Sequence, residues 1–215
     1  MIIKILRKKT GEERRRWQTF EYEPGQKGET IATLLNNLNK NNPDADIRWD
    51  CGCLQKKCGA CAMVINGRPS LACGVKLTDL KKEVRIEPLR KFPVVEDLIT
   101  DRSILQTDLF NSQVWLEHEA APEEKDQDIL YEASRCLQCG CCLEVCPNFM
   151  PDDTFFGMAA AIPMARLLTE GGMEDRKRIK KHYKNHVYSG CGKSLSCRDI
   201  CPAGIDIENL LVRAI

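Results

Sequence analysis

The chain has 215 residues, of which 43% are apolar, so disorder is not the default and one or two packed domains are expected. The formal net charge is +1, with 19 basic and 13 acidic side chains in residues 1–100 and 13 basic and 18 acidic in the rest. This slight asymmetry lacks the concentrated basic patch of a nucleic-acid binder, so no nucleic acid is expected as a partner. No apolar run approaches the roughly 20 residues needed to span a bilayer, so membrane association is expected only through a partner or a surface contact.

Thirteen cysteines fall in two groups, residues 51–73 and 136–201. A disulfide scaffold is typical of small secreted chains, whereas this sequence opens at Met1–Leu6 without a charged and then apolar leader. The thiols are therefore predicted to be reduced, cytosolic and bound to metal.

Strand patterns dominate the first hundred residues. Residues 2–7 alternate weakly and residues 16–23 more clearly, which predicts a hairpin. Thr30 is predicted to cap a helix that ends at Asn41-Asn42-Pro43, with apolar positions at Ile31, Leu34, Leu35 and Leu38. A further strand at residues 62–65 is closed by the turn pair Asn66-Gly67, and a last one is predicted at residues 84–87.

Four cysteines of the first group stand at Cys-x4-Cys-x2-Cys with a distant fourth, the spacing of plant-type [2Fe-2S] ligands. Gly52, Gly59 and Ala60 keep this loop free of bulk, because backbone N–H groups must approach the cluster sulfurs. With the strands and helix above, this predicts a β-grasp plant-type ferredoxin domain at residues 1–101. Its predicted ligands are Cys53, Cys58, Cys61 and Cys73.

Residues 102–215 show helical periods instead, so the fold class is α+β with a C-terminal α-helical, bacterial-ferredoxin-like domain. Ser103 is predicted to cap one helix, and Asp126 a second that leads to Cys136. Further helices are predicted at residues 158–168, interrupted or begun at Pro163, and at residues 174–184 and 206–215.

The run Cys-x2-Cys-x2-Cys-x3-Cys-Pro at residues 136–147 is that of bacterial ferredoxins, in which the fourth cysteine binds the other of two clusters. A second half-motif, Cys191, Cys197 and Cys201 followed by Pro202, has Ser194 where its second cysteine would stand. The crossing predicts a [4Fe-4S] cluster on Cys136, Cys139, Cys142 and Cys201. It leaves three thiolates, Cys146, Cys191 and Cys197, for a predicted [3Fe-4S] cluster, because Ser194 offers a harder and less acidic ligand than a thiolate.

Less specific interpretations remain beside these. Paired cysteines also bind structural zinc, although zinc sites need neither of these two offsets nor the Cys-Pro endings. Cys51 and Cys141 fit neither register and are interpreted as spare thiols, with a substitute-ligand or redox-sensing role as the alternative. His182 and His186 share a helical face without a nearby third ligand, and the basic run at residues 176–181 is interpreted as a solvated face rather than a lipid-binding or partner surface.

The three motifs in this order resemble the iron–sulfur subunit of succinate dehydrogenases and fumarate reductases. The resemblance covers nearly the whole chain and includes residues 58–69, 92–98 and 146–149. It implies a [2Fe-2S] domain that docks on an FAD-containing flavoprotein, and a second domain that faces quinone held with membrane-anchor subunits carrying quinone or haem b. The chain itself would perform no bond chemistry, so no catalytic residue is expected, and it would lie on the cytoplasmic face of the membrane. Gly192 after Cys191 is similar to the menaquinone-linked branch.

Two rival functions differ in class. One is a soluble relay subunit of a non-quinone, thiol- or ferredoxin-linked fumarate reductase. The other is a redox-responsive metal-binding protein, although three clusters in series exceed what a sensor needs. A gene neighbour encoding a multi-helix membrane protein would favour the quinone-linked function, and one with cysteine-rich repeats would favour the thiol-linked relay.

Overall fold

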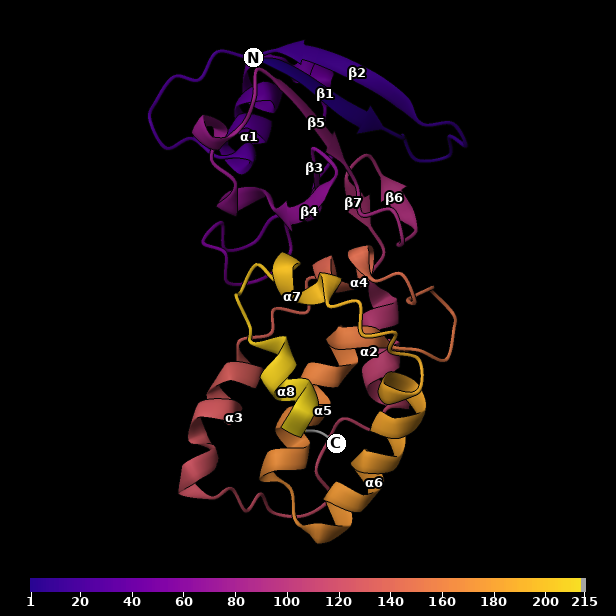
Figure 1. The fold of residues 1–215 in the computed structure, drawn as a ribbon. Coiled ribbons are helices and arrows are strands. Elements are labelled where there is room, and N and C mark those ends of the chain that lie inside the picture. The colour runs from indigo at the N-terminus through magenta and orange to yellow at the C-terminus, as the bar shows by residue number, and fades with distance from the viewer. Residues whose placement is uncertain (214–215) are drawn as a thin grey trace. The chain divides into compact units, whose positions relative to one another are not determined.

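The computed structural model describes residues 1–213, with the side chains of residues 1–211. The chain divides into two compact units, Met1–Asp101 and Arg102–Ile215 (Figure 1). The first contains the β-sheet and the second is helical, which confirms the predicted α+β class.

Five strands form the sheet of the first unit, in the order β2-β1-β5-β3-β4. Strand β1 pairs antiparallel with β2 and parallel with β5, and β3 pairs antiparallel with both β4 and β5. A separate small hairpin, β6 with β7, follows. The strands are β1 Ile2–Arg7, β2 Arg16–Glu21, β3 Ala62–Ile65, β4 Arg68–Leu71, β5 Glu83–Glu87, β6 Val94–Glu96 and β7 Ile99–Thr100.

Local sequence signals explain most of this unit. Helix α1, Ile31–Asn41, begins where Thr30 Oγ1 accepts a hydrogen bond from Thr33 N at 3.3 Å, which confirms the predicted cap. Its four predicted apolar positions are buried, as are Ile3 and Ile5 of β1. Asn66 and Gly67 both have positive φ, 49° and 81°, as a tight hairpin turn between β3 and β4 requires.

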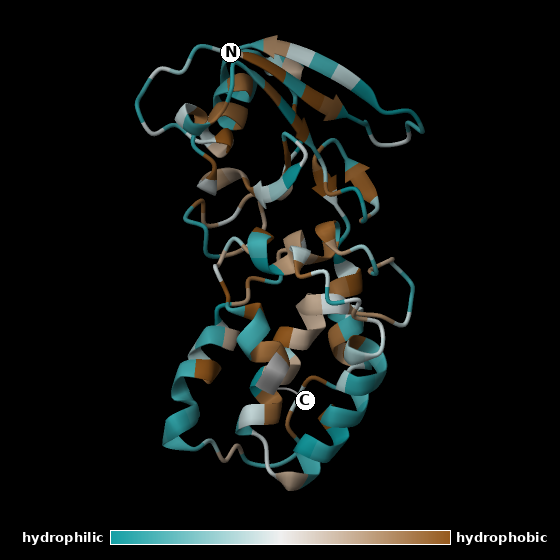
Figure 2. Ribbon diagram, in the orientation of Figure 1, coloured by the Kyte–Doolittle hydropathy of each residue, from teal (hydrophilic) through white to brown (hydrophobic). Residues whose placement is uncertain are grey.

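Seven α-helices lie in the described part of the second unit, with the apolar α5 at its centre. Helix α5 packs against α3, α6 and α8, and Figure 2 shows that α6 is far more hydrophilic than α5. The core includes Ile129 from α3, Met164 from α5 and Ile179 from α6. The helices are α2 Ser103–Asn111, α3 Gln127–Ser134, α4 Cys141–Val145, α5 Gly157–Glu170, α6 Met173–Tyr183, α7 Ser196–Ile200 and α8 Ile207–Arg213, and a π-helix, Lys184–Tyr188, extends α6.

Several predicted helix ends were wrong. Ser103 is the first helical residue of α2, with Arg102 at the cap position. Asp126 does stand at the N-cap position of α3, as predicted, but its side chain makes no capping hydrogen bond. Pro163 neither begins nor interrupts α5, which runs continuously through it. The closing helix begins after Asp206, whose Oδ1 accepts from Asn209 N at 3.2 Å, and Ala214 and Ile215 lie outside the described residues.

Within residues 1–213, every helix is too short or too polar to cross a lipid bilayer.

Candidate metal centres

The loop after Cys53 wraps its backbone around sulfur atoms. Gln55 N and Lys57 N each lie 3.3 Å from Cys53 Sγ, and Cys53 N lies 3.4 Å from Cys58 Sγ. The other two predicted ligands join through this loop, because Lys56 N donates to Cys73 Sγ at 3.3 Å and the Sγ atoms of Cys61 and Cys73 are 3.4 Å apart. The structure therefore brings together all four cysteines of the predicted [2Fe-2S] set.

Unusual backbone conformations produce this wrap. Leu54 and Lys56 have φ of 53° and 60°, in the left-handed region that L-residues seldom occupy. At Gly52 a Cβ atom would lie 3.2 Å from Cys58 Sγ, so the absence of a side chain leaves room for the sulfur. The N–H groups of Gln55 and then Lys57 lower the pKa of Cys53 to about 7, which favours the thiolate that binds iron.

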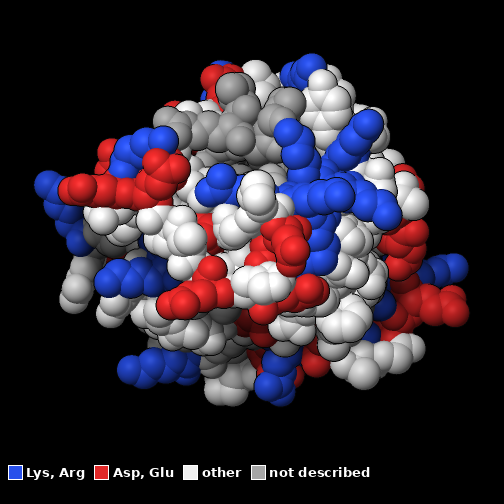
Figure 3. Space-filling model, turned by 90° about the horizontal axis from the view of Figure 1, so that it is seen from below, with Lys and Arg blue, Asp and Glu red and all other residues white. Residues whose placement is uncertain are grey.

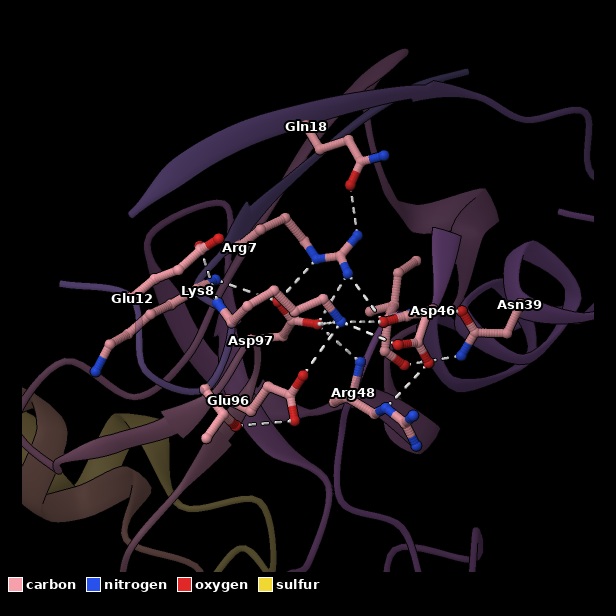
Figure 4. Close-up of polar contacts among 12 residues, drawn as sticks. Arg7, Lys8, Glu12, Gln18, Asn39, Asp46, Arg48, Glu96 and Asp97 are labelled. Carbon is pink, nitrogen blue, oxygen red and sulfur yellow. Dashed lines mark hydrogen bonds and ion pairs between the residues drawn. The ribbon is translucent and has the colours of Figure 1, made fainter. Parts of the chain in front are cut away.

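A buried polar network anchors the chain just ahead of this loop (Figure 4). The Asp97 carboxylate accepts from Arg7 Nε and Nη2, both at 2.9 Å, and from Arg48 N at 3.0 Å. Arg7 Nη2 also donates to Asp46 O at 2.9 Å. Strand β1, the β6–β7 turn and the segment that leads to Cys51 are thus held by one ion pair.

In the second unit a pocket is lined by four cysteines from distant parts of the sequence. Three come from the first half-motif, and Cys201 immediately follows α7. Helix α4, which carries Cys142, packs against α7, and this contact brings the two half-motifs together. The cysteines that line the pocket are Cys136, Cys139, Cys142 and Cys201, the predicted [4Fe-4S] set.

The remaining three predicted ligands lie near one another, two of them at the other ends of the same two helices and Cys191 in the loop before α7. Cys146 immediately follows α4 and Cys197 lies in α7. Burial, together with the neighbouring Cys146 and Cys191, raises the pKa of Cys197 to about 11. Ser194, in the loop between Cys191 and Cys197, is exposed.

Four of the cysteines, Cys136, Cys139, Cys142 and Cys201, line a shared pocket. Among the described residues, no three Cys, His, Asp or Glu side chains are arranged to hold a single metal ion.

Sequence reasoning missed the position of Cys141. This residue is fully buried, and its thiol hydrogen-bonds to the sulfur of Cys139. That bond lowers the pKa of Cys139 to about 7 and, with burial, raises the pKa of Cys141. The only sequence feature that could have pointed to this contact is that Cys141 is next to the predicted ligand Cys142, but the cysteine spacing of ferredoxins assigns no function to Cys141. Cys51, by contrast, is exposed.

The other candidate groups have packing roles. The rings of His182 and His186 lie 5.9 Å apart, and His186 stacks on Phe156 at 4.3 Å. In the basic run, Arg178 binds Asp175 and the carbonyl of Gln113. On the face shown in Figure 3, Lys and Arg side chains gather in one area with Asp and Glu beside it, as on a mixed, solvated surface.

Comparison with known proteins identifies the family. Residues 2–107 match the 2Fe-2S iron–sulfur cluster binding domain, and residues 132–205 match the 4Fe-4S dicluster domain. The chain is 34% identical over 179 residues to the succinate dehydrogenase iron–sulfur subunit of Bacillus subtilis, covering 78% of this chain and 70% of that one. The chain belongs to the succinate dehydrogenase and fumarate reductase iron–sulfur subunit family. It is thus an electron-transfer subunit of an oxidoreductase, with [2Fe-2S] and [4Fe-4S] domains.

One further relative and one solved structure extend the likeness. The fumarate reductase iron–sulfur subunit of Wolinella succinogenes is 28% identical over 199 residues, covering 84% of this chain and 80% of that one. The Sdh1 complex of Mycobacterium smegmatis in its apo form contains a chain with the same fold, with a TM-score of 0.81 and 24% identity. That match covers 99% of this chain and 92% of the other.

Proposed function

We propose that this chain carries electrons between the FAD of a flavoprotein subunit and a quinone, in a succinate:quinone or quinol:fumarate oxidoreductase. The observation that carries the proposal is the crossed arrangement of the second unit, where Cys201 lines one pocket with the first half-motif while Cys146 lies beside Cys197. Two adjacent clusters in one helical unit are what a linear electron path requires.

Each cysteine set has a proposed cluster. Cys53, Cys58, Cys61 and Cys73 hold the [2Fe-2S] cluster, and Cys136, Cys139, Cys142 and Cys201 hold the [4Fe-4S] cluster. Cys146, Cys191 and Cys197 hold a [3Fe-4S] cluster, since Ser194 supplies no thiolate at the fourth corner. The clusters accept and release single electrons, and the protein sets their potentials through burial and hydrogen bonds to sulfur.

The partners follow from the ends of this path. Electrons enter or leave through a flavoprotein at the [2Fe-2S] cluster and through quinone, proposed to be menaquinone, at the [3Fe-4S] cluster. A membrane-anchor subunit, or subunits, holds the quinone or haem b, and the chain lies on the cytoplasmic face. Gly192 after Cys191, as in the menaquinone-linked branch, supports the choice of quinone.

The crossed ligand sets can be tested by exchanging one cysteine at a time in the purified complex. We expect Cys201→Ser to alter the EPR signal of the reduced [4Fe-4S] cluster and to spare the oxidised [3Fe-4S] signal, with Cys146→Ser giving the reverse. The opposite pattern would refute the crossing. The need for a flavoprotein is tested separately, because the isolated chain with intact clusters should not turn over succinate or fumarate with an artificial dye.

A further inference from the structure

Gln138 stands between the first two cysteines of the four-cysteine pocket, and its side chain reaches a sulfur atom. Its Nε2 atom lies 3.3 Å from Cys136 Sγ and 2.8 Å from the carbonyl oxygen of Ala159. Its own backbone has φ of 49°, in the left-handed region. Gln138 thus bridges a proposed cluster ligand and the central helix α5.

The Ala159 carbonyl lacks its usual hydrogen-bond donor within helix α5. In an α-helix it would receive the N–H of the residue four positions later, which here is Pro163, and proline has no N–H. The Gln138 amide supplies the missing donor, which explains why α5 runs through Pro163 without a break.

The orientation of the Gln138 amide is fixed by its partners. A cysteinyl sulfur and a carbonyl oxygen are both acceptors, so only the NH2 group can face them. The amide oxygen, Oε1, is buried and accepts no hydrogen bond from the described residues. Leaving a buried acceptor unpaired is unfavourable, so this amide is held for its two donors.

We propose that Gln138 is a positioning residue that raises the reduction potential of the [4Fe-4S] cluster by donating a hydrogen bond to Cys136. This rests on the proposed function, which places the cluster in this pocket. A donor aimed at a ligand sulfur stabilises the extra negative charge that the cluster gains on reduction. The pocket walls include Leu137, Ile162 and Ile205, and apolar surroundings strengthen such a bond.

Gln138→Met is the direct test, because methionine keeps the length of the side chain and removes both donors. We expect the midpoint potential of the [4Fe-4S] cluster to fall in an EPR-monitored redox titration of the complex. The expected loss is roughly threefold to tenfold in the equilibrium constant for reduction, and tenfold corresponds to about 59 mV for one electron. The potential of the [2Fe-2S] cluster serves as the internal control and should stay unchanged.

A second substitution separates the electrostatic role from the structural one. Gln138→Met also orphans the Ala159 carbonyl and should lower the thermal stability of the complex. Pro163→Ala returns an N–H that α5 can donate to that carbonyl. In the double variant we expect stability to recover while the potential stays low. If the single variant Gln138→Met loses the cluster, the redox titration is done on the double variant instead.

The outcomes distinguish the inference from the function beneath it. If Gln138→Met keeps its [4Fe-4S] signal and the midpoint potential of that cluster does not change, the proposed role of Gln138 is overturned, while the proposed function still stands. Recovery of the potential together with stability in the double variant would also overturn it, since Gln138 would then act only through the fold. Absence of a [4Fe-4S] signal from the unmodified complex would instead refute the proposed function.

Discussion

Arg7 and Asp97, 90 residues apart in sequence, form a two-pronged ion pair with both N–O distances at 2.9 Å and side chains only 3% and 0% exposed. The pair fastens the first strand of the sheet to the β6–β7 turn, and through Arg48 N and Asp46 O it holds the segment before the first cysteine loop. Removing one partner of such a pair leaves the other charge buried and uncompensated.

We expect Asp97→Asn to destabilise the first unit by about 3 to 5 kcal/mol, the usual cost of breaking a buried pair. Asparagine keeps the side-chain size and tolerates the left-handed φ of 46° at this position, so the variant isolates the charge. The measurement is the urea concentration that half abolishes the visible circular dichroism of the [2Fe-2S] cluster. Glu83→Gln is the matched control, because Glu83 pairs with Lys4 at the surface, where the loss of an ion pair costs far less stability than the loss of a buried one. Equal losses in the two variants would contradict this account of the pair.

The same pair predicts a loss of stability in acid. Burial alone would raise the pKa of Asp97, but hydrogen bonds from Arg7 and Arg48 N outweigh it and hold that pKa below its usual value. The contribution of Asp97 is therefore complete above the unfolded-state pKa, about 3.9, and is lost as the pH falls through the lower folded-state pKa. Stability measured from pH 6 down to pH 2 should fall less steeply in Asp97→Asn than in the unmodified chain. Parallel curves would argue against this linkage.

Cys51 is predicted to stay outside the [2Fe-2S] cluster. The backbone donors of the loop point at Cys53, Cys58 and Cys73, whereas Cys51 is exposed ahead of the wrap. Cys51→Ser should keep the EPR signal of the reduced cluster, while Cys53→Ser should abolish or strongly change it. Loss of the signal in Cys51→Ser would overturn the ligand set.

Burial predicts opposite reactivity for the two cysteines outside the ligand sets. Cys51 is exposed and Cys141 has no exposed surface, so iodoacetamide should modify Cys51 and spare Cys141 in the complex with its clusters intact. Peptide mass spectrometry after labelling reads out each site, and unfolded protein stripped of iron provides the fully labelled reference. Modification of Cys141 without loss of a cluster would show that the buried position described for it is wrong.

Ser194 is predicted to decide the type of the third cluster. The unmodified complex should show the EPR signal of an oxidised [3Fe-4S] cluster, because three thiolates leave one corner without a ligand. Ser194→Cys should diminish that signal in favour of a [4Fe-4S] cluster and should slow quinone reduction. Ser194→Ala, which cannot bind iron, is the control and should retain the [3Fe-4S] signal. A fourth iron in the unmodified protein would refute the assignment.

Sequence reasoning succeeded where the determinants are local. Thr30 caps α1 through a residue three positions away, and Asn66-Gly67 adopts the turn that its two residues favour. Cysteine spacing was informative about the site because clusters impose fixed offsets on their ligands. The fold brings together the cysteines of both four-cysteine sets, and the clusters assigned to them stay predictions.

The sequence-based predictions failed where residues far apart in the chain determine the local structure. Helices α4 and α7 have five residues each, too few to show a period, and they pack against each other. Pro163 should have ended a helix by the local rule, but an amide 25 positions earlier in the chain replaces the missing N–H. Arg7 and Asp97 are separated by 90 residues, and the sequence around neither residue indicates that they pair.

If Cys146 and Cys201 bind crossed clusters as proposed, the crossing also constrains the order of events during synthesis. The first cluster set closes at Cys73, so its last ligand is made long before the second unit is finished. Cys136, Cys139 and Cys142, by contrast, must wait for Cys201, and at roughly 5 to 20 residues per second the ribosome needs several seconds to deliver it. Cys146 waits in the same way for Cys191 and Cys197. During that interval these four thiols remain without iron, so we expect the second unit to depend on a reducing environment and on iron–sulfur delivery after translation more than the first does.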